Sequence, residues 1–285
     1  MENQTGGITM GLRINTNVVS QSAQRTLSIT NQDQAESLTK LSSGKRINKA
    51  ADDAAGLAIS EKLRAKIRGT TQAERNANDG ISLIQTAEGG LNEIANILIR
   101  LRELSIQSAS DTVGNQEREF ANLEYEQLKT EIQRISNSTE FNGKKLLNGE
   151  GEKYDFQIGI FNVPNEDRIS YDASVINSGV DSLNISDANV LSKEDAQGSL
   201  DPLDTAIQKI SGQRAILGAI QNRLGSTINN LQISNENLNA ANSRIIDTDY
   251  ASETSNNVRN NILTQAGTSV LAQANVRNQA ALKLI

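Results

Sequence analysis

The chain lacks histidine, cysteine and tryptophan, and only two of its 285 residues are proline. Without histidine and cysteine there is no Ser-His-Asp or Cys-His nucleophile, no Cys/His zinc site, no thiol redox chemistry and no disulfide. Four tyrosines and four phenylalanines are the only aromatic residues, which leaves little to line a ligand pocket. Most enzyme classes are therefore excluded, and we expect no catalytic residues, no metal and no cofactor.

Basic charge and long apolar runs are also scarce. Lys and Arg number 28 against 34 Asp and Glu, a formal net charge of -6, whereas nucleic-acid binding needs a basic surface. No apolar run approaches about 18 residues, and the first twenty residues hold no apolar segment of signal-peptide length. We expect neither nucleic acid nor a membrane as a partner. The polar residues 1–9 are predicted to be an extension, with Met10 as an alternative start.

A heptad repeat is the strongest pattern in the C-terminal part. Leucine or isoleucine occupies every seventh position, and further apolar residues follow three or four positions later. This predicts a helix about 60 Å long, with Asp201 as its N-cap and Pro202 at its first position. The heptad positions are Leu203, Ile210, Leu217, Leu224, Leu231, Leu238 and Ile245.

A helix of that length needs partners, and two upstream segments carry matching stripes. Their apolar residues recur at steps of three and four, which indicates amphipathic helices. The stripes are Ala77, Ile81, Ile84, Ala87, Leu91, Ile94, Leu98 and Leu101, then Ala121, Tyr125, Leu128, Ile132 and Ile135. We therefore predict a mainly α fold, an elongated helical bundle or coiled coil built from the N- and C-terminal halves.

Between these segments the period changes to two. Tyr154, Phe156, Ile158 and Ile160 alternate with polar or glycine residues, and Ile169 and Tyr171 alternate again beyond a short polar turn with Pro164. This predicts one small β-hairpin. Residues 174–201 are rich in Ser, Asn, Asp and Gly and are predicted to form a loose connection at the surface.

Both ends of the chain carry thin, alanine-rich apolar stripes. They offer little area at about 25 cal/mol per Å² against about 1–2 kcal/mol of backbone entropy per residue. We therefore predict that the ends order on each other or on neighbouring subunits. The candidate assembly residues are Leu27, Leu38 and Leu41 near the start and Leu263, Val270 and Ile285 near the end.

Three local motifs have a functional and a structural interpretation. Asp52 and Asp53 are a candidate metal or acid/base pair, but capping of the following helix is favoured. The segment SSGKRIN at residues 42–48 is not a phosphate loop, because it has one glycine and no Ser or Thr after its lysine, and it predicts a bend. Gly89 and Gly90 indicate close packing or a kink in a helix.

Asparagine and glutamine are abundant, with 13 of the 32 asparagines between residues 222 and 278. These amides indicate either a solvated helix face or many weak polar contacts between subunits.

Several separated motifs, in order, resemble bacterial flagellin, the subunit of the flagellar filament. They are GLRINTN (11–17), LSSGKRINKAADDAAGLAIS (41–60), AERNANDGISLIQTAEGGLNEI (73–94), LIRLRELSIQSAS (98–110), EFNGKKLLNG (140–149), SRIIDTDYASE (243–253) and QANVRNQAALKLI (273–285). Only residues 150–201 separate the last N-terminal motif from Pro202, so the chain resembles a short flagellin without large outer domains. Without histidine it cannot carry the HExxH zinc motif that some relatives have in that region.

The resemblance implies a structural, non-catalytic subunit that is secreted by type III export and polymerises into the hollow extracellular filament used for swimming. Expected partners are other copies, an export chaperone, and the hook-associated junction and cap proteins. The implied regions are an inner-tube helix and spoke start at 10–50, outer-tube helices at 51–140, the hairpin region and connection at 141–201, a long outer-tube helix at 202–246 and an inner-tube helix at 247–285.

The resemblance also implies contact with the vertebrate Toll-like receptor for flagellin. Receptor-recognised flagellins use an Arg and a Leu in the motif that matches LIRLRELSIQ, and a Glu in the next helix. These positions are Arg100, Leu104 and Glu124 here. Leu104 is equally well explained as a contact between subunits.

Two alternatives stay open at this point. A hook–filament junction protein would share the tube helices without propagating a long filament. A hydrolase using Asp52 and Asp53 would show turnover that depends on a divalent metal.

Overall fold

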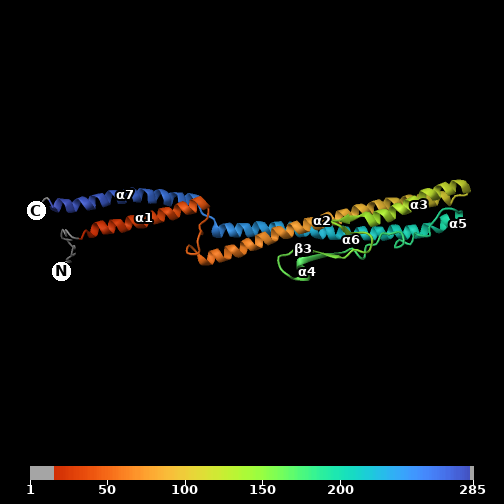
Figure 1. The fold of residues 1–285 in the computed structure, drawn as a ribbon, viewed down its shortest axis with the longest axis horizontal. Helices are drawn as coiled ribbons and strands as arrows, with labels where there is room; N and C mark the ends of the chain where they lie inside the picture. Colours follow the sequence, from red (N-terminus) through yellow and green to blue (C-terminus); the bar gives the residue numbers. More distant parts are fainter. Residues whose placement is uncertain (1–15, 283–285) are drawn as a thin grey trace, which may run out of the picture. The chain divides into compact units, whose positions relative to one another are not determined.

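The computed structural model describes residues 16–282, and the described chain is mainly α-helical (Figure 1). The helices are α1 Val18–Ser43, α2 Ala54–Ser108, α3 Asn115–Ser138, α4 Pro164–Asp167, α5 Lys193–Gly198, α6 Leu200–Ile246 and α7 Tyr250–Leu282. The strands are β1 Glu140–Phe141, β2 Lys144–Lys145, β3 Lys153–Gln157 and β4 Arg168–Asp172. No helix in the described range is long and apolar enough to span a bilayer. The predicted fold class, mainly α with a small β-hairpin, is confirmed.

The chain divides into two compact units. One contains residues up to Arg64 together with those from Asn239 onward, and the other is the continuous segment Ala65–Leu238. The long helices α2 and α6 each contribute residues to both units. Each unit is described separately below.

The core of the unit Ala65–Leu238 is the seam between α2, α3 and α6. Its residues are those of the predicted stripes, and Ile84, Leu98, Ile132, Leu203 and Leu217 are all fully buried. Such apolar burial at heptad spacing is what holds long helices together. The stripe-based prediction of three packed helices is confirmed.

Burial along the α6 heptad is less uniform than predicted. Leu224 is fully buried, but Leu231 and Leu238 are only half-buried. The reason is the number of partners, because α3 ends at Ser138 and polar pairs such as Gln232 Nε2 to Glu74 Oε1 at 2.8 Å join α6 to α2 in this region. Two helices alone cannot surround a side chain.

The predicted hairpin is strands β3 and β4, paired antiparallel from Lys153 with Asp172 to Gln157 with Arg168. The rings of Tyr154 and Tyr171 stack with centroids 6.0 Å apart. Phe156 lies against α2 at Gly80, and Asn76 of α2 donates its side-chain amide to the Gln157 carbonyl at 3.0 Å. A second, shorter hairpin joins β1 and β2, which the sequence analysis did not predict.

The expectation of a loose surface connection at residues 174–201 is wrong. Its apolar side chains enter the same core, and they are Ile176, Leu183, Ile185, Val190 and Ala196, all buried. Polar side chains satisfy the backbone between them, as when Asn122 of α3 accepts the Val190 amide at 3.1 Å. Small polar residues here serve tight backbone turns and do not indicate exposure.

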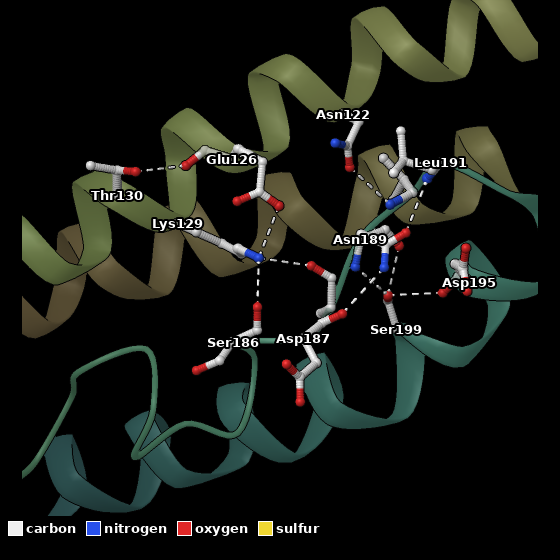
Figure 2. A network of polar contacts seen from close by, with 12 residues as sticks. Asn122, Glu126, Lys129, Thr130, Ser186, Asp187, Asn189, Leu191, Asp195 and Ser199 are labelled. Carbon is white, nitrogen blue, oxygen red and sulfur yellow. Dashed lines mark hydrogen bonds and ion pairs between the residues drawn. The ribbon is translucent and has the colours of Figure 1, made fainter.

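Lys129 of α3 fixes the middle of this segment. Its ammonium donates to the carbonyls of Ser186 and Ala188, each at 2.9 Å. Figure 2 shows the ammonium between Ser186 and the carboxylate of Glu126. The residue is only 8% exposed. A buried cation held by three oxygen partners is a positioned hydrogen-bond donor and not a free surface charge.

Helix α6 begins at Leu200, so the prediction of Asp201 as its N-cap is wrong. The Ser199 carbonyl accepts the Leu203 amide at 3.2 Å, two residues earlier than the Asp201 carbonyl that would accept the first helical bond from an Asp201 cap. Ser199 also closes α5, which the sequence analysis did not anticipate directly before α6. Pro202 still lies in the first turn, where its missing amide removes no hydrogen bond.

Candidate functional site

The terminal helices α1 and α7 lie side by side and form the candidate functional site (Figure 1). They come from opposite ends of the chain, and both belong to the same unit. Asn17 caps α1 by accepting the Ser20 amide at 3.0 Å, and its amide group donates to the Ala274 carbonyl of α7 at 2.9 Å. One side chain therefore both starts α1 and fixes it against α7.

The buried residues of this helix pair are small, and most of them are polar, with Ala274 of α7 as the apolar one. The described residues of α1 that are buried are Ser20, Thr30 and Ser37. Ser20 Oγ donates to Asn275 Oδ1 at 2.9 Å, and the Gln34 amide donates to the Asn261 side chain. Hydrogen bonds between side chains thus set the register of the two helices, while little apolar surface is removed from water.

The outer surface of the pair carries many large apolar side chains among its polar ones. The following large apolar side chains of α1 and α7 are exposed: Val18, Val19, Ile29, Leu38, Val258, Ile262, Leu263, Val270 and Val276. A groove of about 560 Å³ runs along part of this surface, lined by Val18, Val19, Ser22, Ala23, Thr26, Leu27, Thr30, Leu263, Ala266, Gly267 and Val270. Exposed apolar surface arranged in a groove marks an interaction site.

The structure brings three of the six predicted assembly residues together in this groove: Leu27, Leu263 and Val270. Leu38 is exposed on α1 but does not line the groove, and Leu41 is half-buried. Ile285 lies outside the described residues.

A polar hollow of about 240 Å³ lies farther along the same helix pair. It is lined by Asp33, Glu36, Ser37, Lys40, Glu253, Asn256, Arg259 and Asn260. The Lys40 ammonium lies 2.6 Å from Glu36, and this hydrogen bond is the main cause that raises the pKa of Lys40. The pair thus presents an apolar stretch followed by a charged one.

The bend after α1 is built from the SSGKRIN segment. Gly44 ends the helix with φ +68°, a left-handed conformation that favours glycine. Its carbonyl accepts the Thr248 amide at 3.0 Å, and the Arg46 amide donates to the Ile246 carbonyl at 2.7 Å. The segment between α1 and α2 and the segment between α6 and α7 are therefore hydrogen-bonded to each other. The predicted bend at residues 42–48 is confirmed.

The two neighbouring aspartates act as caps. Asp53 Oδ1 accepts the Gly56 amide at 2.8 Å in the first turn of α2, and Asp52 accepts the amides of Asn48 and Lys49. These two backbone amides lower the pKa of the Asp52 carboxyl, with the Lys49 bond the larger cause. Capping by Asp53 is confirmed, and within residues 16–282 no group of three or more acidic residues is arranged to hold a metal.

The predicted receptor residues separate into two environments. Arg100 Nε lies 2.9 Å from Glu124 Oε1, and both side chains are close to half exposed. Hydrogen bonding to Glu124, and secondarily to Glu103, raises the pKa of Arg100. Leu104 is 3% exposed and belongs to the helix core. The surface therefore offers the ion pair but not the leucine.

The small buried residues of the terminal pair were missed by the sequence analysis. A signal was present, because Ala23, Thr30 and Ser37 are small residues at successive heptad positions. Small residues at that spacing allow close helix approach. Apolar periodicity alone does not reveal these contacts, because the residues that make them are polar or small.

Comparisons with known proteins agree with this architecture. Residues 14–152 match the model of the bacterial flagellin N-terminal helical region, and residues 200–285 match that of the C-terminal helical region. The chain is 45% identical over 274 residues to a flagellin of Halalkalibacterium halodurans, which covers 95% of this chain and 99% of that protein.

Two further relatives and one solved structure are similar. Identity is 42% both to a Bacillus subtilis flagellin (96% of this chain, 100% of that protein) and to the flagellar filament 33 kDa core protein of Treponema phagedenis (95% and 99%). The crystal structure of Bacillus cereus flagellin is 33% identical with a TM-score of 0.49, covering 55% of this chain and 88% of that one. The chain therefore belongs to the bacterial flagellin family and is a structural subunit of the extracellular flagellar filament.

Proposed function

We propose that the α1–α7 pair is the surface through which copies of this flagellin pack into the filament, each groove filled by terminal helices of neighbouring copies. The supporting observation is the burial pattern of the pair: its buried residues are the small side chains Ser20, Thr30, Ser37 and Ala274, whereas its large apolar side chains are exposed. A pair organised in this way gains most of its hydrophobic stabilisation from further copies.

The size of this gain follows from the exposed side chains. Leu263 and Val270 are 48% and 51% exposed, so covering each adds about 1 kcal/mol, half of the roughly 1.5–3 kcal/mol for burying such a side chain completely. Nine such positions per copy make assembly strongly cooperative, because every added copy covers its own apolar surface and that of its neighbours.

The test replaces Leu263 and Val270 together by asparagine. We expect the critical concentration for polymerisation to rise by at least about 30-fold, since about 2 kcal/mol is lost at every contact. The control is Val175→Asn together with Leu191→Asn, the same two kinds of change at side chains that are 66% and 51% exposed and outside the terminal helices. Sedimentation of seeded protein measures both, and polymerisation of the double variant at the wild-type concentration would contradict the proposal.

The same surface is open before assembly, so it is where an export chaperone would act. We propose that the chaperone covers the exposed apolar residues of α7, and that the junction and cap proteins meet the terminal pair as the first and last neighbours of the filament. In this assignment, residues 10–50 and 247–285 form the inner tube, and residues 51–140 and 202–246 form the outer tube. The leading alternative, a junction protein, predicts assembly that stops after a few copies, whereas the full-length relatives are named as flagellins and filament core proteins.

We also propose that the monomer is recognised by the Toll-like receptor for flagellin through Arg100 and Glu124. The support is their exposed ion pair, with Leu104 acting only by holding α2 in place. A reporter-cell assay on monomeric protein should show a response that Arg100→Ala reduces and that the distant Arg134→Ala leaves unchanged. No response to the wild-type monomer at high concentration would reject this assignment.

A further inference from the structure

The outward face of α3 carries an exposed apolar pair in an acidic setting. Phe120 and Leu123 are 63% and 65% exposed and lie on the side of the helix opposite its buried residues. Glu119 precedes them, and Gln116 and Gln127 complete an exposed stripe at steps of three and four. We call Glu119, Phe120 and Leu123 the α3 patch.

The charges around the α3 patch are mainly negative, although Glu124, Glu126 and Glu131 are paired with Arg100, Lys129 and Arg134. Five carboxylates lie on α3 at Glu117, Glu119, Glu124, Glu126 and Glu131. Two of its three cations, Arg118 and Lys129, are buried, which leaves Arg134 as the exposed one. Pairing of this face with the same face of another copy would place carboxylates against carboxylates, which disfavours a symmetric dimer.

A basic surface of complementary character lies on α2 in the same unit. Arg68 and Arg75 are both exposed and lie seven residues apart, on one side of the helix, and neither makes an ion pair with any residue in the range 16–282. The carboxylate beside Arg75, Glu74, accepts a hydrogen bond from Gln232. We call Arg68 and Arg75 the α2 basic face.

The two surfaces cannot meet within one copy. The Glu124–Arg100 ion pair places the α3 patch beside Arg100 of α2, about 30 residues after the α2 basic face. At 1.5 Å per residue that is about 45 Å along the helix. Any contact between them is therefore made by two copies.

We propose that the α3 patch of one copy docks on the α2 basic face of a second copy, with an arginine covering the ring of Phe120. This inference rests on the proposed function, because it names a contact within the same polymer. Joining two different surfaces of one chain gives a head-to-tail contact, which propagates into an open helical assembly instead of closing as a dimer. The arginine is attracted to the face of the Phe120 ring, and the surrounding carboxylates pair with the basic side chains and so orient the two copies.

The test is a charge swap between the two surfaces. Glu119→Lys alone and Arg68→Glu alone each put like charges in contact, so we expect the critical concentration for polymerisation to rise about tenfold in low salt. The double variant carrying both changes restores the opposite charges and should polymerise close to wild type. Phe120→Ser should be impaired at every salt concentration, and Glu152→Lys, an exposed charge reversal outside both surfaces, is the matched control.

The outcomes separate the two proposals. Circular dichroism and thermal melting of each monomer establish that the variants fold as the wild type does. Failure of the wild type itself to polymerise would overturn the proposed function. Three other outcomes would overturn the docking contact and leave the proposed function standing, provided that the wild type polymerises. They are normal polymerisation of both single variants, impaired polymerisation of only one of them, and a double variant that polymerises no better than the single variants.

Discussion

Gly89 and Gly90 are adjacent in α2 and predict opposite effects of the same substitution. A Cβ atom at Gly89 would have no atom within 4 Å, whereas one at Gly90 would lie 2.7 Å from Leu147 Cδ1 and 2.8 Å from Thr139 Oγ1. Leu147 is fully buried, and the Thr139 hydroxyl donates to the Ile135 carbonyl at 2.7 Å. Neither neighbour can move away without disturbing the end of α3.

The magnitudes follow from these surroundings. Gly89→Ala should stabilise the unit Ala65–Leu238 by about 0.5–1 kcal/mol, the helix preference of alanine over glycine. Gly90→Ala gains the same term but must displace two packed groups, an overpacking cost of about 1–3 kcal/mol, so the net effect is a loss of about 1–2 kcal/mol.

Urea denaturation of the monomer, followed by circular dichroism, measures both variants against the wild type. The free energies of unfolding of the two variants should differ by about 2 kcal/mol. This difference is the decisive quantity, because adjacent positions in one helix share the same intrinsic preference for alanine over glycine. Equal effects of the two substitutions, in either direction, would refute the close approach of α2 to Leu147 and Thr139. The sequence analysis treated both glycines alike, and the structure confirms close packing for Gly90 alone.

Three further predictions concern other parts of the molecule. Lys129→Met should destabilise the monomer by about 2 kcal/mol in urea denaturation, because the Ser186 and Ala188 carbonyls lose a charged donor, and it should speed proteolysis between residues 181 and 192. The control is Arg134→Met, which removes an exposed ion pair and should change the free energy of unfolding by less than about 0.5 kcal/mol. Burial raises the pKa of Tyr171, so folding favours the neutral phenol. The contribution of Tyr171 to stability is therefore fully present below the ordinary tyrosine pKa of about 10 and is lost as pH rises through the higher pKa of the folded state. Tyr171→Phe should weaken the alkaline loss of stability seen in pH-dependent melting. Asp53→Ala should lower stability by about 1 kcal/mol through loss of the α2 cap, whereas Asp53→Asn, which keeps an acceptor for the Gly56 amide, should recover most of it in the same thermal melts.

The long helices could be predicted from sequence because their burial is periodic. Leu91, Leu98, Leu203 and Leu217 are fully buried at the spacing that a helix seam requires, so apolar pattern and tertiary packing agree. The β3–β4 hairpin was equally visible as an alternation of two. In these regions the spacing of apolar residues along the chain is enough to predict which side chains are buried.

Residues 174–201 were mispredicted because composition and burial disagree there. Leu183 and Ile185 are buried among Ser, Asn and Asp residues that satisfy backbone groups locally. Their cover comes from α3, which is distant in sequence, and the decisive contact is the Lys129 ammonium on the Ser186 and Ala188 carbonyls. A single-sequence pattern does not reveal which lysine bonds backbone carbonyls nearly 60 positions away.

The sequence predicted some of the exposed apolar residues of the candidate site but not the small residues that are buried between its two helices. The thin stripes identified Leu27, Leu263 and Val270 as assembly residues, but their sparseness alone indicated only weak contacts. The structure adds that Ser20, Thr30 and Ser37 are the buried residues of α1, whereas Leu263 and Val270 are about half exposed. A hydrogen-bonded register aligns the two helices before assembly, and apolar cover is supplied only by other copies. Helix pairing and polymerisation therefore depend on different residues. Ser20→Ala, which removes the hydrogen bond to Asn275, should alter the alignment of the pair, while changes at Leu263 and Val270 should alter only its association.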